Sequence, residues 1–207
     1  MLAFTRLTSI LLFVLSLSFL VSALPTSESK ALAARHDSNA LVELILDLQA
    51  KVDVHVKAIR KCFHSVAVEE DTKPPLVAVE VALELVAKIG LLIADINACA
   101  TAVLAIGANI DIDASVKADI GVKVAAIISV IVKLCIDLVA KFGIFVVGAL
   151  LVQIDLCLKV LISNLGVCVD GLVAVIAEIV VNIGVSVLAS VKFDLCIKVL
   201  GFVGVNV

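Results

Sequence analysis

The chain has 207 residues, of which 63% are hydrophobic and 17% charged, and its formal net charge is −3. An ordinary globular chain is about 45–50% apolar with glycine included, so this composition leaves few residues for a conventional polar surface. The charges form no basic cluster, which excludes nucleic acid as an expected partner.

The first 23 residues have the layout of a secretory signal peptide. Arg6 supplies a positive n-region, Leu7–Val21 an apolar core, and Val21-Ser22-Ala23 a small-residue cleavage pattern. We therefore expect a secreted protein, extracellular or in the cell wall, from which residues 1–23 are removed. Residues 24–36 contain few large apolar side chains, and we expect a disordered mature N-terminus there.

A long helix is predicted at the start of the remaining chain. Asp37-Ser38-Asn39 is a cluster of helix N-cap residues, and charged residues then recur at every fourth position, which predicts a helix over about residues 40–66. Its histidines, His55 and His64, are nine positions apart and would point to opposite sides of the helix. We interpret both histidines as solvated side chains and not as a metal site.

A charged turn is predicted over Glu69–Pro75, because two adjacent prolines stop a helix. Pro75 can begin the next helix, which the sequence predicts to end at Gly90. The predicted helical domain, residues 37–207, therefore divides into a polar helical hairpin over 37–89 and an apolar helical bundle over 90–207.

The apolar part carries 16 charges in the 118 positions of residues 90–207, against 18 in the 66 positions of residues 24–89. A polar connector is predicted over Gly107–Gly121, with Asp113 or Ser115 capping the helix that follows.

Two apolar helices with thin polar stripes are predicted in Gly121–Gly166, since their few charges fall four positions apart. Asp155 and Lys159 form one of these polar stripes.

Two further apolar helices are predicted over Val167–Ile183 and Val185–Leu200, with glycines at their boundaries. The string Asp194–Leu200 matches Asp155–Leu161 at six of seven positions, 39 residues earlier. That offset is the length of a helical hairpin, so the match can come from an old internal duplication that has since diverged. Chance similarity is the alternative, because the chain uses few residue types.

Six cysteines lie in the predicted mature chain, and an even number behind a signal peptide predicts disulfides in an oxidising compartment. Buried thiols are the alternative, because cysteine behaves as a small hydrophobe. No spacing is C-x-x-C and the histidines lie far from most of the cysteines, so no zinc site is expected. Helical spacing places Cys135 and Cys157 on the inner sides of their helices. The predicted structural cysteines are Cys62, Cys99, Cys135, Cys157, Cys168 and Cys196.

Catalytic motifs are missing from the sequence. No Ser/His/acid or Cys/His arrangement has suitable spacing, no phosphate loop is present, and the last histidine is residue 64. We therefore expect no enzyme activity, no cofactor and no metal. The chain also has no Trp or Tyr, which disfavours sugar binding on aromatic platforms.

The contrast between a polar hairpin and an apolar bundle predicts a structural protein that acts at hydrophobic surfaces. The expected partners are an apolar surface, a lipid or membrane interface, or further copies of the chain through self-association. A lipid carrier with an apolar cavity and a membrane-inserting protein are the alternatives. After the signal peptide no uncharged apolar run reaches the ~18–20 residues that span a bilayer, which disfavours a multi-spanning membrane protein.

This layout of a signal peptide, a charged N-terminal half and a Val/Ile/Leu-rich C-terminal half with scattered cysteines resembles small secreted proteins of mushroom-forming fungi that are not hydrophobins. The resemblance covers the whole chain and implies a role in hyphal attachment and aerial growth. Hydrophobins have adjacent cysteine pairs, which this chain lacks. The predicted fold is all-α, a disulfide-linked, single-domain bundle of about six or seven helices.

Overall fold

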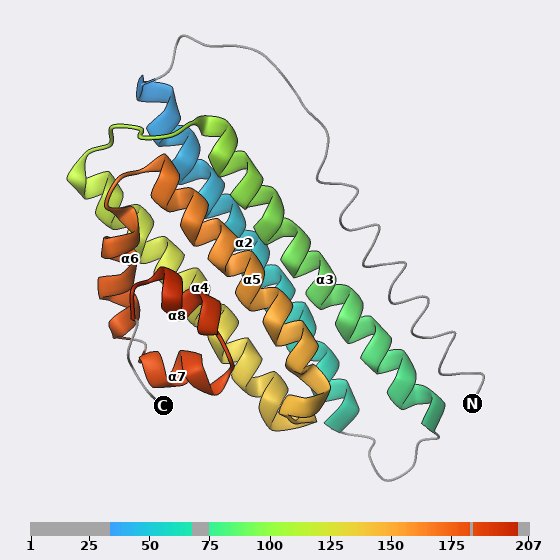
Figure 1. Ribbon diagram of the computed structural model, residues 1–207. Coiled ribbons are helices and arrows are strands. Elements are labelled where there is room, and N and C mark those ends of the chain that lie inside the picture. The colour runs from blue at the N-terminus through green and yellow to red at the C-terminus, as the bar shows by residue number, and fades with distance from the viewer. Residues whose placement is uncertain (1–33, 68–74, 183, 203–207) are drawn as a thin grey trace. The chain divides into compact units, whose positions relative to one another are not determined.

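The computed structural model describes residues 34–67, 75–182 and 184–202 (Figure 1). Within these ranges the chain forms seven helices and no strands, so the predicted all-α class is confirmed. The predicted signal peptide, residues 24–33 and most of the charged turn lie outside the described residues.

Four long helices form a bundle, and three short helices pack on two of them. The long helices are α2 (Ala34–Ala67), α3 (Pro75–Ile106), α4 (Ala114–Phe142) and α5 (Ile144–Cys168). The short helices are α6 (Leu172–Val181), α7 (Val185–Ser190) and α8 (Asp194–Val199).

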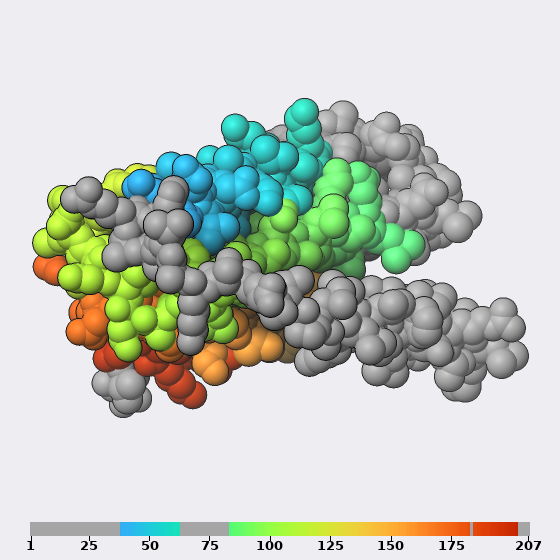
Figure 2. All heavy atoms as spheres, turned by 90° about the horizontal axis from the view of Figure 1, so that it is seen from above, coloured from blue at the N-terminus to red at the C-terminus, as the bar shows by residue number. Residues whose placement is uncertain are grey.

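Successive long helices run in opposite directions (Figure 1). Both α2 and α5 pack on α3 and on α4, so the parallel helices α3 and α5 are neighbours, as are α2 and α4. The connection from α3 to α4 therefore crosses the bundle diagonally. Helix α6 packs on α4 and α5, and α8 packs on α5. Figure 2 shows α2, in blue, on one side of the bundle and the C-terminal helices, in orange and red, on the opposite side.

The first helix begins earlier than the sequence predicted. Helix α2 starts at Ala34, so the predicted capping cluster Asp37-Ser38-Asn39 lies inside the helix. Alanine and arginine are among the best helix formers, and Ala34-Arg35 extends the helix past residues that would otherwise cap it. Pro75 does begin α3, as predicted.

Helix α3 continues through Gly90, where the sequence predicted a helix end. A glycine inside a helix costs about 1 kcal/mol relative to alanine. Ile89 and Leu92, on either side of it, are fully buried in the core, and burying one such side chain contributes about 1.5–3 kcal/mol. Packing therefore outweighs the local preference of glycine for a break.

The two predicted central helices are confirmed as α4 and α5, and their junction is Gly143 with a φ of 79°. Asp113 occupies the N-cap position of α4, as predicted, although its side chain makes no capping hydrogen bond. In the connector before it, the N–H of Ile110 donates to the carbonyl of Cys168, 2.7 Å away. Gly121 is a buried residue inside α4 and does not end the connector.

The C-terminal part is more broken than predicted. Helix α5 continues to Cys168, α6 begins only after Gly171 with a left-handed φ of 72°, and the predicted Val185–Leu200 helix is divided into α7 and α8. Lys192 between them has a φ of 62°, and the next residue, Phe193, is fully buried. Burying Phe193 in the core therefore stabilises the chain more than one unbroken helix would.

Candidate functional site

The outward side of α5 is covered by apolar side chains along the whole helix. From Phe145 to Val160 they recur every three or four positions, which aligns them in one stripe, and Val167 follows two turns later. Phe145 is 100% exposed and Val152 57% exposed. The α5 stripe consists of Phe145, Ala149, Val152, Leu156, Val160 and Val167.

Helix α3 presents a matching uncharged stripe. Leu83 and Leu91 are 60% and 58% exposed, and smaller side chains fill the positions between the leucines. The α3 stripe consists of Leu83, Val86, Leu91, Ala94, Ala98 and Leu104.

The two stripes form one surface, which we call the apolar face, because α3 and α5 pack directly on each other. The side-chain amide of Asn164 on α5 donates to the carbonyl of Ala100 on α3 at 2.8 Å and joins the two helices. The 24-residue apolar segment Leu83–Ile106 is about 36 Å long, and two helices are about 20 Å wide, which gives an area on the order of 700 Å². The largest apolar patch of a typical monomer is about 300–600 Å².

Charged side chains border the apolar face but do not enter it. On α3, Glu84 pairs with Lys88 at 2.9 Å, and Asp95 lies toward Lys51 of α2, at 3.8 Å. On α5, Asp155 is buried against α8, and Lys159 follows it one turn later on the same stripe.

The charges gather instead on the neighbouring helices α2 and α4. Lys57 and Lys133 are exposed there, and Arg60 of α2 pairs with Asp137 of α4 at 2.9 Å. The sequence places polar and apolar residues in successive segments, whereas the folded chain places them on different sides of the bundle. Helix α3, which begins in the predicted polar hairpin, contributes to the apolar face, whereas α4 of the predicted apolar part lies on the charged side.

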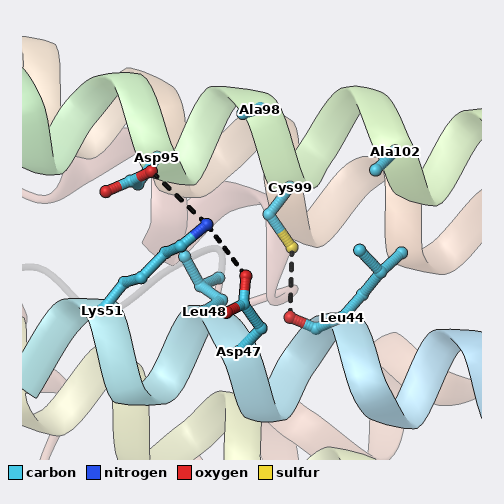
Figure 3. A pocket seen from close by; sticks show the side chains of 8 residues that line it. All are labelled: Leu44, Asp47, Leu48, Lys51, Asp95, Ala98, Cys99 and Ala102. Carbon is cyan, nitrogen blue, oxygen red and sulfur yellow. Dashed lines mark hydrogen bonds and ion pairs between the residues drawn. The ribbon is translucent and has the colours of Figure 1, made fainter.

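A small cavity lies between α2 and α3, with a volume of about 190 Å³ (Figure 3). Lys51 bridges it, pairing with Asp47 at 2.9 Å and approaching Asp95. The hydrogen bond that Lys51 donates to the carboxylate of Asp47 raises the pKa of Lys51. At the apolar end the thiol of Cys99 donates to the carbonyl of Leu44, 3.9 Å away. The lining residues are Leu44, Asp47, Leu48, Lys51, Asp95, Ala98, Cys99 and Ala102.

The prediction that His55 is a solvated side chain is wrong. Its Nε2 lies 2.7 Å from a carboxylate oxygen of Asp95, and the side chain is only 18% exposed. The two residues are 40 positions apart, so only the packing of α2 on α3 brings them together. The side chain of His64 lies outside the described side chains.

The six predicted structural cysteines are all buried, but none forms a disulfide, so the disulfide prediction is wrong for this structure. They are distributed over α2, α3, α4, α5 and α8, and all except Cys62 belong to the hydrophobic core, where cysteine packs as a small apolar side chain. Cys135 and Cys157 point inward, as their spacing predicted. Burial raises the pKa of Cys99 to about 11 and those of Cys135 and Cys157 to about 12.

Asp155 is the one charged side chain among the described residues that is fully withdrawn from solvent, at 2% exposure. The sequence placed it on a polar stripe of α5. Its carboxylate accepts hydrogen bonds from the backbone N–H groups of Leu195 and Cys196, at 2.8 and 2.9 Å. These partners satisfy the carboxylate inside the core, which is why a charge is tolerated there.

In the described part of the chain, no group of three or more His, Cys, Asp or Glu side chains is placed to hold a metal ion. Two helical segments are long and apolar enough to cross a membrane, Leu83–Ile106 and Ile144–Cys168, with 33% and 39% of their most apolar windows buried in the bundle. These two segments carry the apolar face.

The sequence predicts that these helices are apolar, but it does not predict which of their sides form the exposed face. The signal was present in α5, where uncharged residues recur at helical spacing from Phe145 to Val167. Buried and exposed stripes are both apolar in α3 and α5, so spacing alone does not say which stripe of these helices faces outward. No protein-family model matches the chain, and no curated protein matches its sequence at a significant level.

Proposed function

We propose that the protein is a structural, surface-active protein that adsorbs to apolar surfaces through its apolar face. The observation that carries this proposal is the separation of an uncharged α3/α5 surface from a charged α2/α4 side. A protein with this arrangement can bury its apolar face against oil, wax, lipid or air while its charges stay in water. In this proposal the chain needs no catalytic activity and no cofactor.

The energetics favour adsorption without unfolding. Removing apolar surface from water contributes about 25 cal/mol per Å², so withdrawing about 200 Å² contributes about 5 kcal/mol. The helices already satisfy their backbone hydrogen bonds internally, and the bundle core stays intact. Secretion and a place in a hyphal wall belong to the proposal too, supported by residues 1–23 and by the layout of the sequence.

The alternatives receive less support. A lipid carrier needs an apolar cavity of at least a few hundred Å³. The cavity that the described residues form between α2 and α3 has about 190 Å³, and the charged residues Asp47, Lys51 and Asp95 are part of its lining. Insertion across a membrane would require α3 and α5 to leave a core in which Leu92 and Leu158 are fully buried.

The test compares matched substitutions on the two sides of the bundle. Val152→Glu places a charge on the apolar face, and Val54→Glu places the same charge on α2, at a valine of similar exposure. We expect the wild-type protein and Val54→Glu to lower air–water surface tension at micromolar concentration, measured by pendant drop. Val152→Glu, combined with Leu156→Glu, should require about tenfold more protein for the same reduction.

Circular dichroism and thermal unfolding confirm that each variant is folded before its surface activity is compared. If the wild-type protein leaves the surface tension unchanged, the proposal is wrong. If the apolar-face variant and Val54→Glu lose surface activity equally, the assignment of this activity to the apolar face is contradicted.

A further inference from the structure

We infer that the surface bound by the apolar face is an uncharged hydrocarbon surface and not an anionic lipid headgroup layer. This inference rests on the proposed function and adds the chemical class of the partner. It follows from the charges around the face and from the residues missing from it.

Binding to anionic membranes depends on basic residues that reach the headgroups. The α3 and α5 stripes contain no Lys or Arg. Lys88 borders the face on α3 and is paired with Glu84 at 2.9 Å. Lys159 borders it on α5, one turn after the carboxylate of Asp155, so the border offers an anionic surface no excess of positive charge. Electrostatic complementarity therefore favours a partner without charge.

The face also lacks the residues that anchor proteins in a headgroup layer. Trp and Tyr supply these anchors because each combines an apolar ring with a polar tip, and the whole sequence contains neither. Phe145, fully exposed in the first turn of α5, has no polar tip and suits pure hydrocarbon. The hydroxyl of Thr101, which lies between Ala98 and Leu104, already donates to the carbonyl of Asn97 at 2.9 Å. The side chains of the α3 and α5 stripes themselves form no hydrogen bonds, which suits a partner that offers none.

The experiment measures adsorption of the full-length protein to three probes: hexadecane droplets, phosphatidylcholine vesicles, and vesicles of phosphatidylcholine mixed with phosphatidylserine, each at low and high salt. We expect the strongest adsorption to hexadecane, independent of salt, and no gain from phosphatidylserine. Binding that rises with phosphatidylserine and falls with salt would overturn this inference and leave the proposed function standing. Absence of binding to all three probes would overturn both.

A pair of substitutions at one position sharpens the comparison. Val152→Lys and Val152→Glu should both reduce adsorption to hexadecane by about tenfold, because either charge must be dehydrated. The controls Val54→Lys and Val54→Glu on α2 should leave adsorption unchanged. If Val152→Lys instead strengthens the adsorption of the protein while Val152→Glu weakens it, the surface that the face binds is anionic and the inference is wrong.

Sedimentation of the wild-type protein tests the remaining occupant of the face, a second copy of the chain. We expect a monomer at the concentrations used for adsorption. A stable dimer that Val152→Glu dissociates would show that the face is a subunit interface, which would overturn the inference.

Discussion

The carboxylate of Asp155 on α5 accepts a hydrogen bond from the backbone N–H of Cys196 on α8, 2.9 Å away. The first N–H groups of a helix have no partner within that helix, and the same carboxylate also binds the N–H of Leu195. Its negative charge lies at the positive end of the α8 dipole. One buried side chain therefore attaches the last helix to the bundle.

Asp155→Ala is expected to lower the free energy of unfolding by about 2–3 kcal/mol, because it leaves the buried N–H group of Cys196 and the partly buried N–H group of Leu195 without acceptors. Asp194→Ala is the matched control, since Asp194 is the corresponding residue of the repeated string but is exposed at the start of α8. We expect this control to cost less than 1 kcal/mol. Urea denaturation measures both values, and equal losses would contradict the role assigned to Asp155.

Two glycines permit the close approach of α6. A Cβ atom on Gly121 would lie 2.7 Å from Cγ1 of Val175, and one on Gly166 would lie 2.6 Å from Cγ2 of Val173. Valine side chains are stiff at χ1 and yield little. Gly121→Ala and Gly166→Ala should therefore each destabilise the protein by about 1–3 kcal/mol in thermal or urea unfolding.

Gly148→Ala is the control for these substitutions. Gly148 lies inside α5 with no atom near the position of a new Cβ, so alanine should stabilise the protein by about 0.5–1 kcal/mol. A stabilising effect of Gly121→Ala or Gly166→Ala would contradict the packing of α6 described above.

The cysteines should titrate as six thiols. We expect protein purified without reductant to give six equivalents with Ellman's reagent in denaturant, because the structure contains no disulfide. Under native conditions the reaction should be much slower, since thiolate is the reactive form and burial raises the pKa of Cys135 to about 12. Fewer than six equivalents in denaturant would mean that the protein contains disulfides.

Stability should fall in alkali. The thiols of Cys135 and Cys157 have pKa values of about 12 in the folded protein, whereas an unfolded cysteine has a pKa of about 8.5. Their contribution is complete below about pH 8 and is lost as the pH rises toward 12, because the unfolded state loses its protons first. Between pH 9 and 10 each thiol should lower the free energy of unfolding by about 1.4 kcal/mol per pH unit.

The variant Cys135→Ala tests the origin of this slope. The substitution lowers the free energy of unfolding at every pH, because it creates a cavity. The decline of that free energy between pH 9 and 10 should become shallower by the contribution of one thiol. An unchanged slope would mean that other groups cause the alkaline loss.

Helical periodicity and composition were enough to predict the helical class, the helix start at Pro75, the two central helices and the inward cysteines. These features depend on residues close together in the chain, through 3.6-residue periodicity and the effect of proline on local backbone. The same local rules failed at Gly90, where the buried neighbours Ile89 and Leu92 hold the helix together. They also failed for Asp155, whose partners lie 40 and 41 positions away.

Composition and spacing were sufficient to establish that this chain is helical and apolar, because both are local properties. The packing of the helices, which local sequence does not specify, places α3 beside α5, brings His55 to Asp95, and leaves the charges on the α2/α4 side. In α3 and α5 nearly every stripe is apolar enough to be buried, so local sequence does not distinguish their inner sides from their outer sides. The order in which the helices pack around the core therefore selects the stripe that remains exposed.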